Sequence, residues 1–254
     1  MVRAIRSYLR AGSLPVGKFE LRWSVARRGA SQNGAAQGKG VPSLSGGGHK
    51  LHFGPGPGWV KPDADWVTID IDPERGDIAM DFRDYRSLPL PDGSVTAIYA
   101  SHTFEHISIF TIGEVLADCH RVLAPGGRMR IIVPDAGESV RQYLERNENF
   151  PLFVRRREKA KRFYGEDYTI FECMKEDFIS RSNQEFLLGS DRLAHQNAWD
   201  FESLARSLAR AGFDPGKIER SDFRSSATPD FAFEGSYDSE ANERDRSLYV
   251  EVEK

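Results

Sequence analysis

The 254-residue sequence is poor in cysteine and has no long apolar stretch. Its two cysteines, Cys119 and Cys173, lie far apart and match no metal-ligand spacing. They therefore predict no disulfide framework and favour a reducing compartment, the cytoplasm. No apolar run approaches the roughly 20 residues that a membrane-spanning helix needs. Residues 1–17 carry basic side chains but no apolar core, so the sequence predicts no secretory signal.

Charge is unevenly distributed along the chain. Residues 1–50 hold nine Lys and Arg against one Glu, a net charge of +8, so the overall −3 leaves −11 for the remainder. Gly and Ser dominate residues 29–48, a composition typical of flexible segments. We therefore expect a flexible basic leader over 1–48 and a folded domain over 49–254. Contact of this leader with an acidic partner, nucleic acid or an anionic membrane surface is the alternative.

The sharpest functional signal lies between Lys50 and Asp70. An apolar run enters the turn Gly-Pro-Gly-Pro-Gly at 54–58, and a second apolar run, 66–69, ends in Asp70. Glycines after a strand let the backbone approach a ligand closely, because no Cβ intervenes. A carboxylate at the tip of the next strand can accept both hydroxyls of a ribose. The pair predicts a nucleoside-cofactor site.

The spacing of this turn disfavours a dinucleotide. The third glycine of G-x-G-x-x-G is missing, and Pro62 disfavours a long helix before Trp66. Bound phosphates would require a helix N-terminus directly after the turn. We therefore expect a nucleoside cofactor rather than a dinucleotide.

The body of the chain alternates short apolar segments with a helical pattern. We predict strands at 50–53, 66–70, 78–81, 95–100 and 128–133, and a helix at 111–123 that Pro125-Gly126-Gly127 ends. Such alternation implies a parallel sheet with right-handed crossovers. The fold class that we expect is α/β and doubly wound.

After the fifth predicted strand the pattern becomes helical and rich in charge. We predict helices at 137–148, 151–163 and 172–188, then a helix at 201–211 and strands at 217–223 and 247–252. Residues 136–200 are thus predicted to be a helical insertion over the carboxyl ends of the strands, where ligands bind in such sheets. The insertion is a candidate lid and substrate domain. The last two strands are expected to form an antiparallel edge hairpin.

Several motifs taken together resemble a known family. LHFGPG, IDID, LPLPDGSVTAIYASHTFEH, RVLAPGGRMRIIVPD, AGF and SLYVE resemble class I (Rossmann-like) S-adenosylmethionine-dependent methyltransferases over residues 50–254, apart from much of the insertion. The resemblance implies a mostly parallel seven-stranded sheet with an antiparallel last strand. It also implies S-adenosylmethionine as the cofactor.

The resemblance further implies roles for individual residues. The cofactor-binding residues would be Gly54, Pro55, Gly56, Asp70, Ile71, Asp81, Phe82 and Ser101. The glycine turn would pass beneath the methionine part, and Asp70 would bind the ribose. Ile71 and Phe82 would lie near the adenine, and Asp81 would accept a hydrogen bond from its amino group. Ser101 would face the methionine part through its backbone.

Methyl transfer to a hydroxyl needs alignment and usually a base. The candidates are His102, just past the fourth strand, and His195 from the insertion, with Asp135 orienting the substrate. The [D/N]-P-P-[Y/F] signature of nucleic-acid N-methyltransferases is absent, because Ser-His-Thr-Phe stands at 101–104. We therefore expect a small-molecule or glycan-precursor acceptor, and no nucleic acid.

Two alternatives stay open at this point. His102-Thr-Phe-Glu105-His106 matches H-x-x-E-H, the inverted zinc-protease pattern, but it follows a buried strand and shows no third ligand, so no metal is expected. The second alternative is a methyltransferase-like protein that binds a nucleoside without turnover, because the helix that usually follows the glycine turn is missing. The sequence does not indicate an oligomeric state.

Overall fold

The structure is a computed structural model that describes residues 12–16, 19–23, 47–56, 58–179, 194–236, 239 and 242–254. Residues 1–37 and 38–254 form two separate units. Of the first unit only the backbone of two strands is described, β1 Gly12–Val16 and β2 Phe19–Trp23, which pair antiparallel. Most of the predicted leader lies outside the described residues, and its role stays a prediction.

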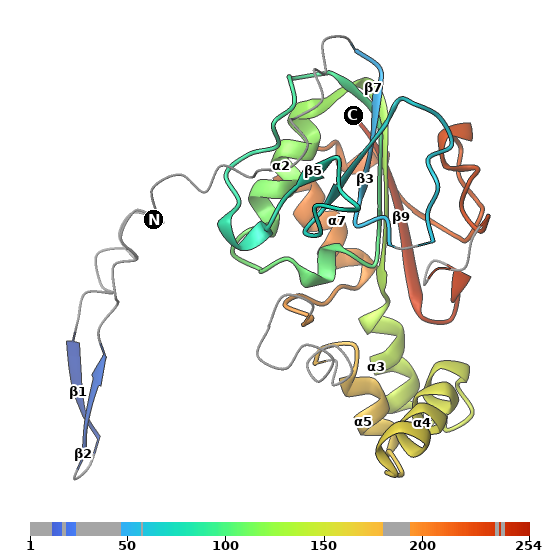
Figure 1. Cartoon of the computed structure of the whole chain (residues 1–254). Helices are drawn as coiled ribbons and strands as arrows, with labels where there is room; N and C mark the ends of the chain where they lie inside the picture. Colours follow the sequence, from blue (N-terminus) through green and yellow to red (C-terminus); the bar gives the residue numbers. More distant parts are fainter. Residues whose placement is uncertain are drawn as a thin grey trace. The chain divides into compact units, whose positions relative to one another are not determined.

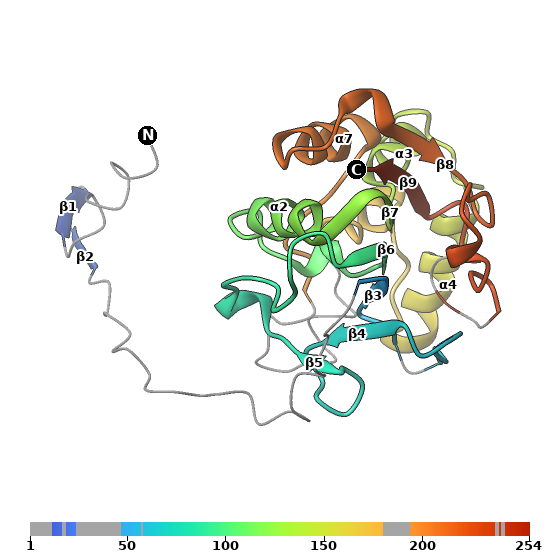
Figure 2. The same ribbon diagram turned by 90° about the horizontal axis from the view of Figure 1, so that it is seen from above.

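The second unit is built on a seven-stranded sheet with the order β5-β4-β3-β6-β7-β9-β8 (Figure 1, Figure 2). Its strands are β3 His49–Phe53, β4 Trp66–Asp70, β5 Ile78–Ala79, β6 Val95–Ser101, β7 Leu123–Pro134, β8 Ile218–Ser221 and β9 Ser247–Glu253. Neighbours from β5 to β7 are parallel, and β9 is antiparallel to β7 and β8. The predicted mostly parallel sheet with an antiparallel last strand is confirmed.

The C-terminal hairpin is placed differently from the prediction. β8 and β9 do pair antiparallel, but β9 lies between β7 and β8 rather than at the edge. Burial explains the order. Six of the seven residues of β9 are buried, so both of its edges need neighbours, whereas the short and partly exposed β8 suits an edge position.

Two predicted strand boundaries also shift. β5 ends at Ala79, because the Asp81 side chain accepts the backbone N–H of Arg83 and so caps the 3-10 helix η1 Phe82–Asp84. β7 begins at Leu123 instead of residue 128, because the Pro-Gly-Gly turn lies within the strand as an irregularity in its pairing with β6.

Helices cover one face of the sheet. α2 Ile112–Val122 and α7 Phe201–Arg210 pack side by side on this face (Figure 1, Figure 2). Val115, Leu116 and Cys119 of α2 are fully buried there, in agreement with the predicted apolar stripe. Leu204 and Leu208 of α7 pack into the same hydrophobic core, which lies between these helices and the sheet.

The opposite face is covered by an aromatic segment instead. Trp66 and Tyr99 on the strands pack against Phe231 and Phe233, which belong to the connection from β8 to β9 around the 3-10 helix η4 Pro229–Phe231. His52 lies among these rings, and burial lowers its pKa to about 3, so it stays neutral. Aromatic packing thus covers this face of the sheet, and the described residues between β3 and β4 form no helix.

A buried ion-pair network anchors this aromatic segment to the sheet. The Arg130 guanidinium on β7 lies 2.7 Å from the Glu234 carboxylate and 2.5 Å from the Glu251 carboxylate on β9. It also donates to the backbone carbonyl of Asp222 at 2.7 Å. All three charged side chains are nearly inaccessible to solvent, and the Arg128 guanidinium, 3.8 Å from Glu251, adds a second positive charge to the two carboxylates.

The helical insertion follows β7 and lies beyond the carboxyl ends of the strands (Figure 1). It contains α3 Ala136–Leu144, α4 Pro151–Tyr164 and α5 Ile170–Lys175, which share a small core of their own. The predicted helix at 172–188 is only partly described, because residues 180–193 lie outside the described residues. The role of the insertion as a lid stays a prediction.

Both ends of the insertion are tied to the sheet. Ala136 N donates to Trp199 O at 3.0 Å, which brings the outgoing and returning chain together. Gln196 N and Asn197 N donate to the backbone carbonyl of Glu105 at 2.8 and 3.0 Å. The returning segment is therefore fixed beside the 3-10 helix η2 Phe104–His106, which follows β6.

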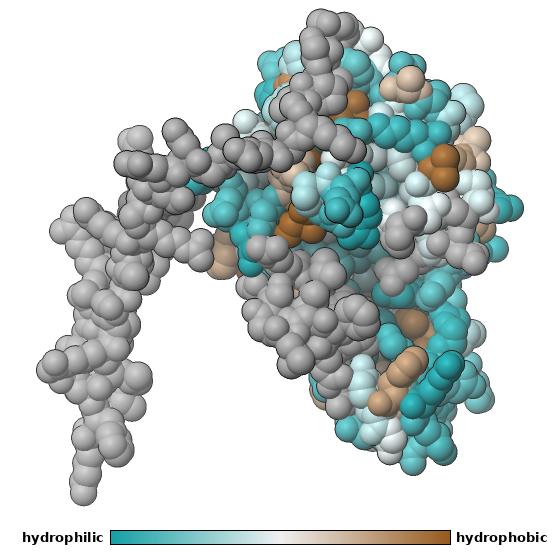
Figure 3. Space-filling view, viewed as in Figure 1, coloured by the Kyte–Doolittle hydropathy of each residue, from teal (hydrophilic) through white to brown (hydrophobic). Residues whose placement is uncertain are grey.

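The face of the molecule shown in Figure 3 is mostly hydrophilic over its coloured residues. Over the coloured residues of Figure 3, apolar side chains gather in small separate spots. Among the described residues, none of the helices combines the length and apolarity needed to cross a membrane.

Candidate functional site

A cavity of about 560 Å³ lies at the carboxyl ends of β3, β4, β5 and β6. Residues of the glycine turn, the tip of β4, η1 and η2 line it, together with one residue of the returning insertion. Six of the eight predicted cofactor-binding residues are among them: Gly54, Gly56, Asp70, Ile71, Asp81 and Phe82. The structure thus brings most of the predicted site together in one place.

The glycine turn has two glycines with left-handed backbone conformations. Gly54 has φ +60°, and a Cβ there would lie 2.5 Å from the Thr103 hydroxyl oxygen. Gly56 has φ +69°, and a Cβ there would meet nothing within 4 Å. Pro55 between them is buried and does not line the cavity. Gly54 therefore allows close chain packing, whereas Gly56 leaves open space at the cavity.

Asp70 ends β4 at the edge of the cavity. Its side chain is mostly buried, and one carboxylate oxygen accepts the backbone N–H of Asp72 at 2.9 Å. Ile71, the next residue, is partly exposed and also lines the cavity. A carboxylate fixed in this way by its own turn is oriented before any ligand binds.

Asp81 is engaged within the protein. Its carboxylate forms an ion pair with the Arg83 guanidinium at 2.6 Å and accepts the Arg83 backbone N–H at 3.0 Å. Phe82 lies with its ring 5.8 Å from that of Tyr85, at an interplanar angle of 27°. A ligand amino group that binds Asp81 would therefore share this carboxylate with Arg83.

The end of β6 differs from the prediction. Ser101 does not line the cavity, and its carbonyl accepts the Thr103 hydroxyl at 3.1 Å. Thr103 and His102 line the cavity in its place. His102 has φ +47°, in the left-handed region that is unfavourable for a residue other than glycine. Residues with such strained backbone conformations cluster at functional sites.

Both ring nitrogens of His102 face protein groups. Nε2 lies 2.9 Å from the Ser247 hydroxyl, and Nδ1 lies 3.3 Å from a carboxylate oxygen of Glu105. The His102 side chain is only 4% exposed. His102 is therefore held between Ser247 and Glu105 while it lines the cavity, and its role as the base stays a prediction.

The pairing of His102 also bears on the inverted zinc-protease pattern. That pattern needs His102 and His106 on one face of a helix. Here the segment between them is the three-residue η2, and His102 Nε2 points to Ser247. The two histidines of the motif therefore do not form a metal pair with each other.

Asp135 is a helix cap. One carboxylate oxygen accepts the Glu138 backbone N–H at 2.9 Å at the start of α3, and the other lies 3.4 Å from the Arg220 guanidinium. Burial raises the pKa of Asp135. It does not line the cavity, so its predicted role in orienting the substrate has no support from its position.

His195 lies beside Glu105 and His106 of η2, which were not predicted as site residues. Its ring centroid is 5.1 Å from that of His106, and both rings are close to the carboxylate of Glu105. His106 and Gln196, the neighbour of His195, line the cavity. In the sequence, the one indication of this cluster is the pair Glu105-His106, which lies inside the H-x-x-E-H pattern of inverted zinc proteases.

Glu105 is the electrostatic centre of this cluster. Its side chain is 1% exposed, and burial alone would raise its pKa. The rings of His102, His106 and His195 outweigh burial and hold the pKa of Glu105 at about 2. Burial lowers the pKa of His195, so that ring is neutral near pH 7. The buried carboxylate of Glu105 thus lies among three imidazole rings, and its interactions with them favour its ionised form.

Residues 51–131 match a family model described as a methyltransferase domain. Among solved structures, a SAM-dependent methyltransferase from Archaeoglobus fulgidus is similar over 84% of this chain and 89% of that chain, with 11% identity and a TM-score of 0.41. One from Mesorhizobium loti covers 82% and 92%, with 15% identity and a TM-score of 0.42. None of the curated proteins compared with the chain matches it.

The family match extends from β3 into β7. It therefore includes the glycine turn, Asp70, Asp81 and the residues after β6, which line the cavity together with Gln196 from outside the matched segment. The open space at Gly56 and the oriented carboxylate of Asp70 suit a ribose-containing cofactor. We conclude that residues 51–131 match a methyltransferase domain, and that the seven-stranded sheet around them is consistent with the S-adenosylmethionine-dependent class I fold.

Proposed function

We propose that the chain methylates a small-molecule acceptor, such as a sugar or another glycan precursor, and that the accepting atom is a hydroxyl oxygen. The observation that carries this proposal is the shared cavity, in which Gly56 and Asp70 meet residues of η2. Its volume of about 560 Å³ suits small ligands rather than a nucleic-acid groove. The cytoplasmic location stays a prediction.

The cofactor end of the cavity would be formed by β3, β4 and η1. Asp70 would accept the ribose hydroxyls, because its carboxylate is held at the tip of β4 by Asp72 N. The backbone at Gly56 would lie against the methionine part, with no side chain in the way. Ile71 and Phe82 would provide apolar contacts for the adenine, and Asp81 a polar one.

The acceptor end would be formed by η2 and the returning insertion. His106, Ser108 and Gln196 supply polar groups on that side of the cavity. His106 Nδ1 contacts the carbonyl of Ala194 at 3.3 Å, so this nitrogen is the donor and Nε2 carries the lone pair. The polar side chains of Ser108 and Gln196 can orient a hydroxyl and accept hydrogen bonds from it.

S-adenosylmethionine, when bound, supplies an activated methyl group on a sulfonium leaving group. The task of the chain is then to align the acceptor oxygen and to exclude water. The 3-10 helix η2 would contribute to both tasks, because the side chains of Phe104 and Glu105 are buried and give this end of the cavity a fixed wall that excludes water. The acceptor hydroxyl must also lose its proton. Which group takes up this proton depends on the histidines around Glu105.

Binding of S-adenosylhomocysteine, followed by calorimetry, tests the cofactor assignment. We expect saturable binding by the wild-type chain and binding weaker by about 100-fold in Asp70→Ala, because two charge-assisted hydrogen bonds worth at least about 1.5 kcal/mol each are lost. Asp92→Ala is the matched control, since Asp92 is exposed and pairs with Arg121 away from the cavity. Equal affinities in all three proteins would refute the assignment.

Turnover tests the rest of the proposal. The chain, S-adenosylmethionine and a panel of hydroxyl-bearing sugars and other small molecules should release S-adenosylhomocysteine with an acceptor present. Release driven only by amine acceptors would exclude the hydroxyl. Tight binding without release for any acceptor would instead favour the nucleoside-binding alternative.

A further inference from the structure

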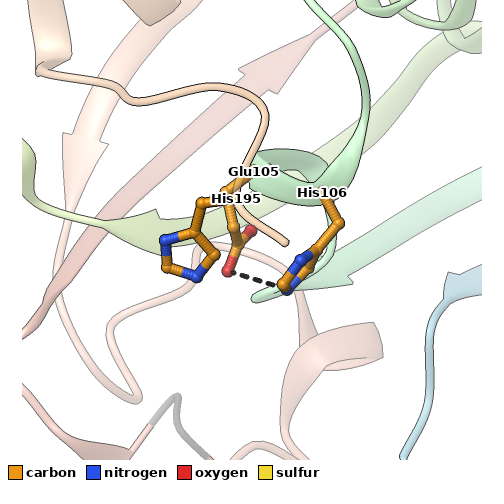
Figure 4. Close-up of side chains that lie close together, drawn as sticks. All are labelled: Glu105, His106 and His195. Atoms are coloured by element: carbon orange, nitrogen blue, oxygen red, sulfur yellow. Dashed lines mark ion pairs between the residues drawn. The ribbon is translucent and has the colours of Figure 1, made fainter. Parts of the chain in front are cut away.

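Glu105, His106 and His195 converge from two distant parts of the chain (Figure 4). Each offers one possible ligand atom, and these atoms all lie within 4.8 Å of one another. Glu105 Oε1 and His106 Nε2 are 3.8 Å apart. In a tetrahedral zinc site, metal–ligand distances of about 2.1 Å place ligand atoms roughly 3.4 Å apart. The cluster is therefore close to the spacing that a metal ion imposes.

The hydrogen bonds of both histidines orient them as metal ligands. His106 Nδ1 contacts the carbonyl of Ala194 at 3.3 Å, and His195 Nδ1 contacts the carbonyl of Asp177 at 2.9 Å. A carbonyl can only accept, so Nδ1 carries the proton in each ring and Nε2 the lone pair. Metal-binding histidines commonly have this second hydrogen bond, which fixes the tautomer and the ring orientation.

The buried carboxylate of Glu105 forms its ion pairs with histidine rings alone among the described residues. Among the described residues, neither of its oxygens has a hydrogen-bond partner, although the side chain is 1% exposed. His102 Nδ1 lies 3.3 Å from one of these oxygens. An ionised carboxylate is costly to bury without hydrogen bonds or a bound cation. This is the observation that points to a ligand.

We infer that Glu105, His106 and His195 bind a divalent transition-metal ion of the zinc class. Two imidazole nitrogens and one carboxylate oxygen favour Zn²⁺ and its first-row neighbours, whereas Mg²⁺ and Ca²⁺ prefer oxygen ligands alone. Three protein ligands leave a coordination position open, as in catalytic rather than structural zinc sites. The sequence predicts no metal, because the H-x-x-E-H motif follows a strand and shows no third ligand nearby, whereas His195 comes from the distant insertion.

The position of the site gives it a chemical role, and this role rests on the proposed function. His106 lines the cavity, so the metal ion lies at its acceptor end. A divalent charge there lowers the pKa of an acceptor hydroxyl that reaches it. The hydroxyl proton leaves to water, the oxygen bonds to the methyl carbon, and the carbon–sulfur bond breaks with its electron pair kept by sulfur.

The test is metal binding by the full chain after treatment with a chelator. Calorimetry with Zn²⁺ should show one equivalent bound, and Co²⁺ should give the visible absorption of a low-symmetry site. Mg²⁺ should not compete at equal concentration. We expect Glu105→Gln and His195→Asn to weaken Zn²⁺ binding by about 100-fold, while His120→Asn, a partly exposed histidine on α2, leaves it unchanged.

Circular dichroism and S-adenosylhomocysteine binding, measured on the same samples, separate the outcomes. Failure of folded wild-type protein to bind Zn²⁺, or equal binding by folded His195→Asn, overturns the metal site. Loss of folding in one variant is resolved by the other, because each removes a different ligand. Zinc binding without S-adenosylhomocysteine binding would refute the proposed function and leave the metal site standing.

Discussion

The two left-handed glycines of the turn should respond differently to the same substitution. A Cβ at Gly54 would lie 2.5 Å from the Thr103 hydroxyl oxygen, whereas a Cβ at Gly56 would have open space. The φ values, +60° and +69°, are similar, so the backbone cost of alanine is similar at both positions, about 1 kcal/mol. Any further loss of stability at Gly54 therefore reports the contact with Thr103.

The extra cost at Gly54 follows from what Thr103 does. Its hydroxyl lies 3.0 Å from Phe53 O and 3.1 Å from Ser101 O, so it joins the ends of β3 and β6. A methyl group at 54 displaces this hydroxyl, which loses a hydrogen bond worth about 1 kcal/mol and adds overpacking strain of about 1 kcal/mol or more. We expect Gly54→Ala to cost about 3 kcal/mol and Gly56→Ala about 1 kcal/mol.

Urea unfolding followed by circular dichroism measures both free energies of unfolding, and calorimetry measures S-adenosylhomocysteine binding. Gly56→Ala should weaken binding while it changes stability little, because its methyl group occupies the cavity. In a double-mutant cycle, Thr103→Ala should remove most of the difference between the glycines. Equal loss of stability in the two glycine variants, or no coupling to Thr103, would show that this reasoning is wrong.

Three further outcomes follow from buried groups. Arg130→Met should destabilise the fold by about 3 kcal/mol or more, because it leaves Glu234 buried and unpaired, and urea unfolding checks this. The pKa of Glu105 falls from an ordinary 4.5 to about 2 on folding, so its contribution to stability is complete above pH 4.5 and is lost as the pH falls toward 2. In Glu105→Gln, acid unfolding curves should be flatter across that window. Burial raises the pKa of Cys119, so this thiol should react with iodoacetamide at pH 8 only after unfolding, as mass spectrometry would show.

Local patterns in the sequence were sufficient to predict most of the sheet. β4, for example, is a continuous apolar run with an acid at its tip, and it spans residues 66–70 as predicted. Glycine and proline turns mark where such strands end, and the alternation with helices implies a parallel arrangement. The same logic placed Asp70 and Gly56 at one edge, where the structure brings them into one cavity.

The parts that were missed depend on contacts between distant residues. No local pattern shows that β9 inserts between β7 and β8, or that Arg130 meets Glu234 more than 100 residues later. The same applies to His195, whose partners Glu105 and His106 lie about 90 positions earlier. The roles of Asp135 and Ser101 stay predictions, because a position after a strand does not tell whether a residue caps a helix, as Asp135 does, or faces a ligand.

The placement of β9 has a consequence for synthesis of the chain. β8 leaves the ribosome before Ser247–Glu253, yet β9 is its only neighbour in the described sheet. Until β9 arrives, the outer edge of β7 offers unpaired N–H and C=O groups to other chains. Chains halted before residue 247 would therefore be prone to aggregate, and completion of this sheet is a late event in biogenesis.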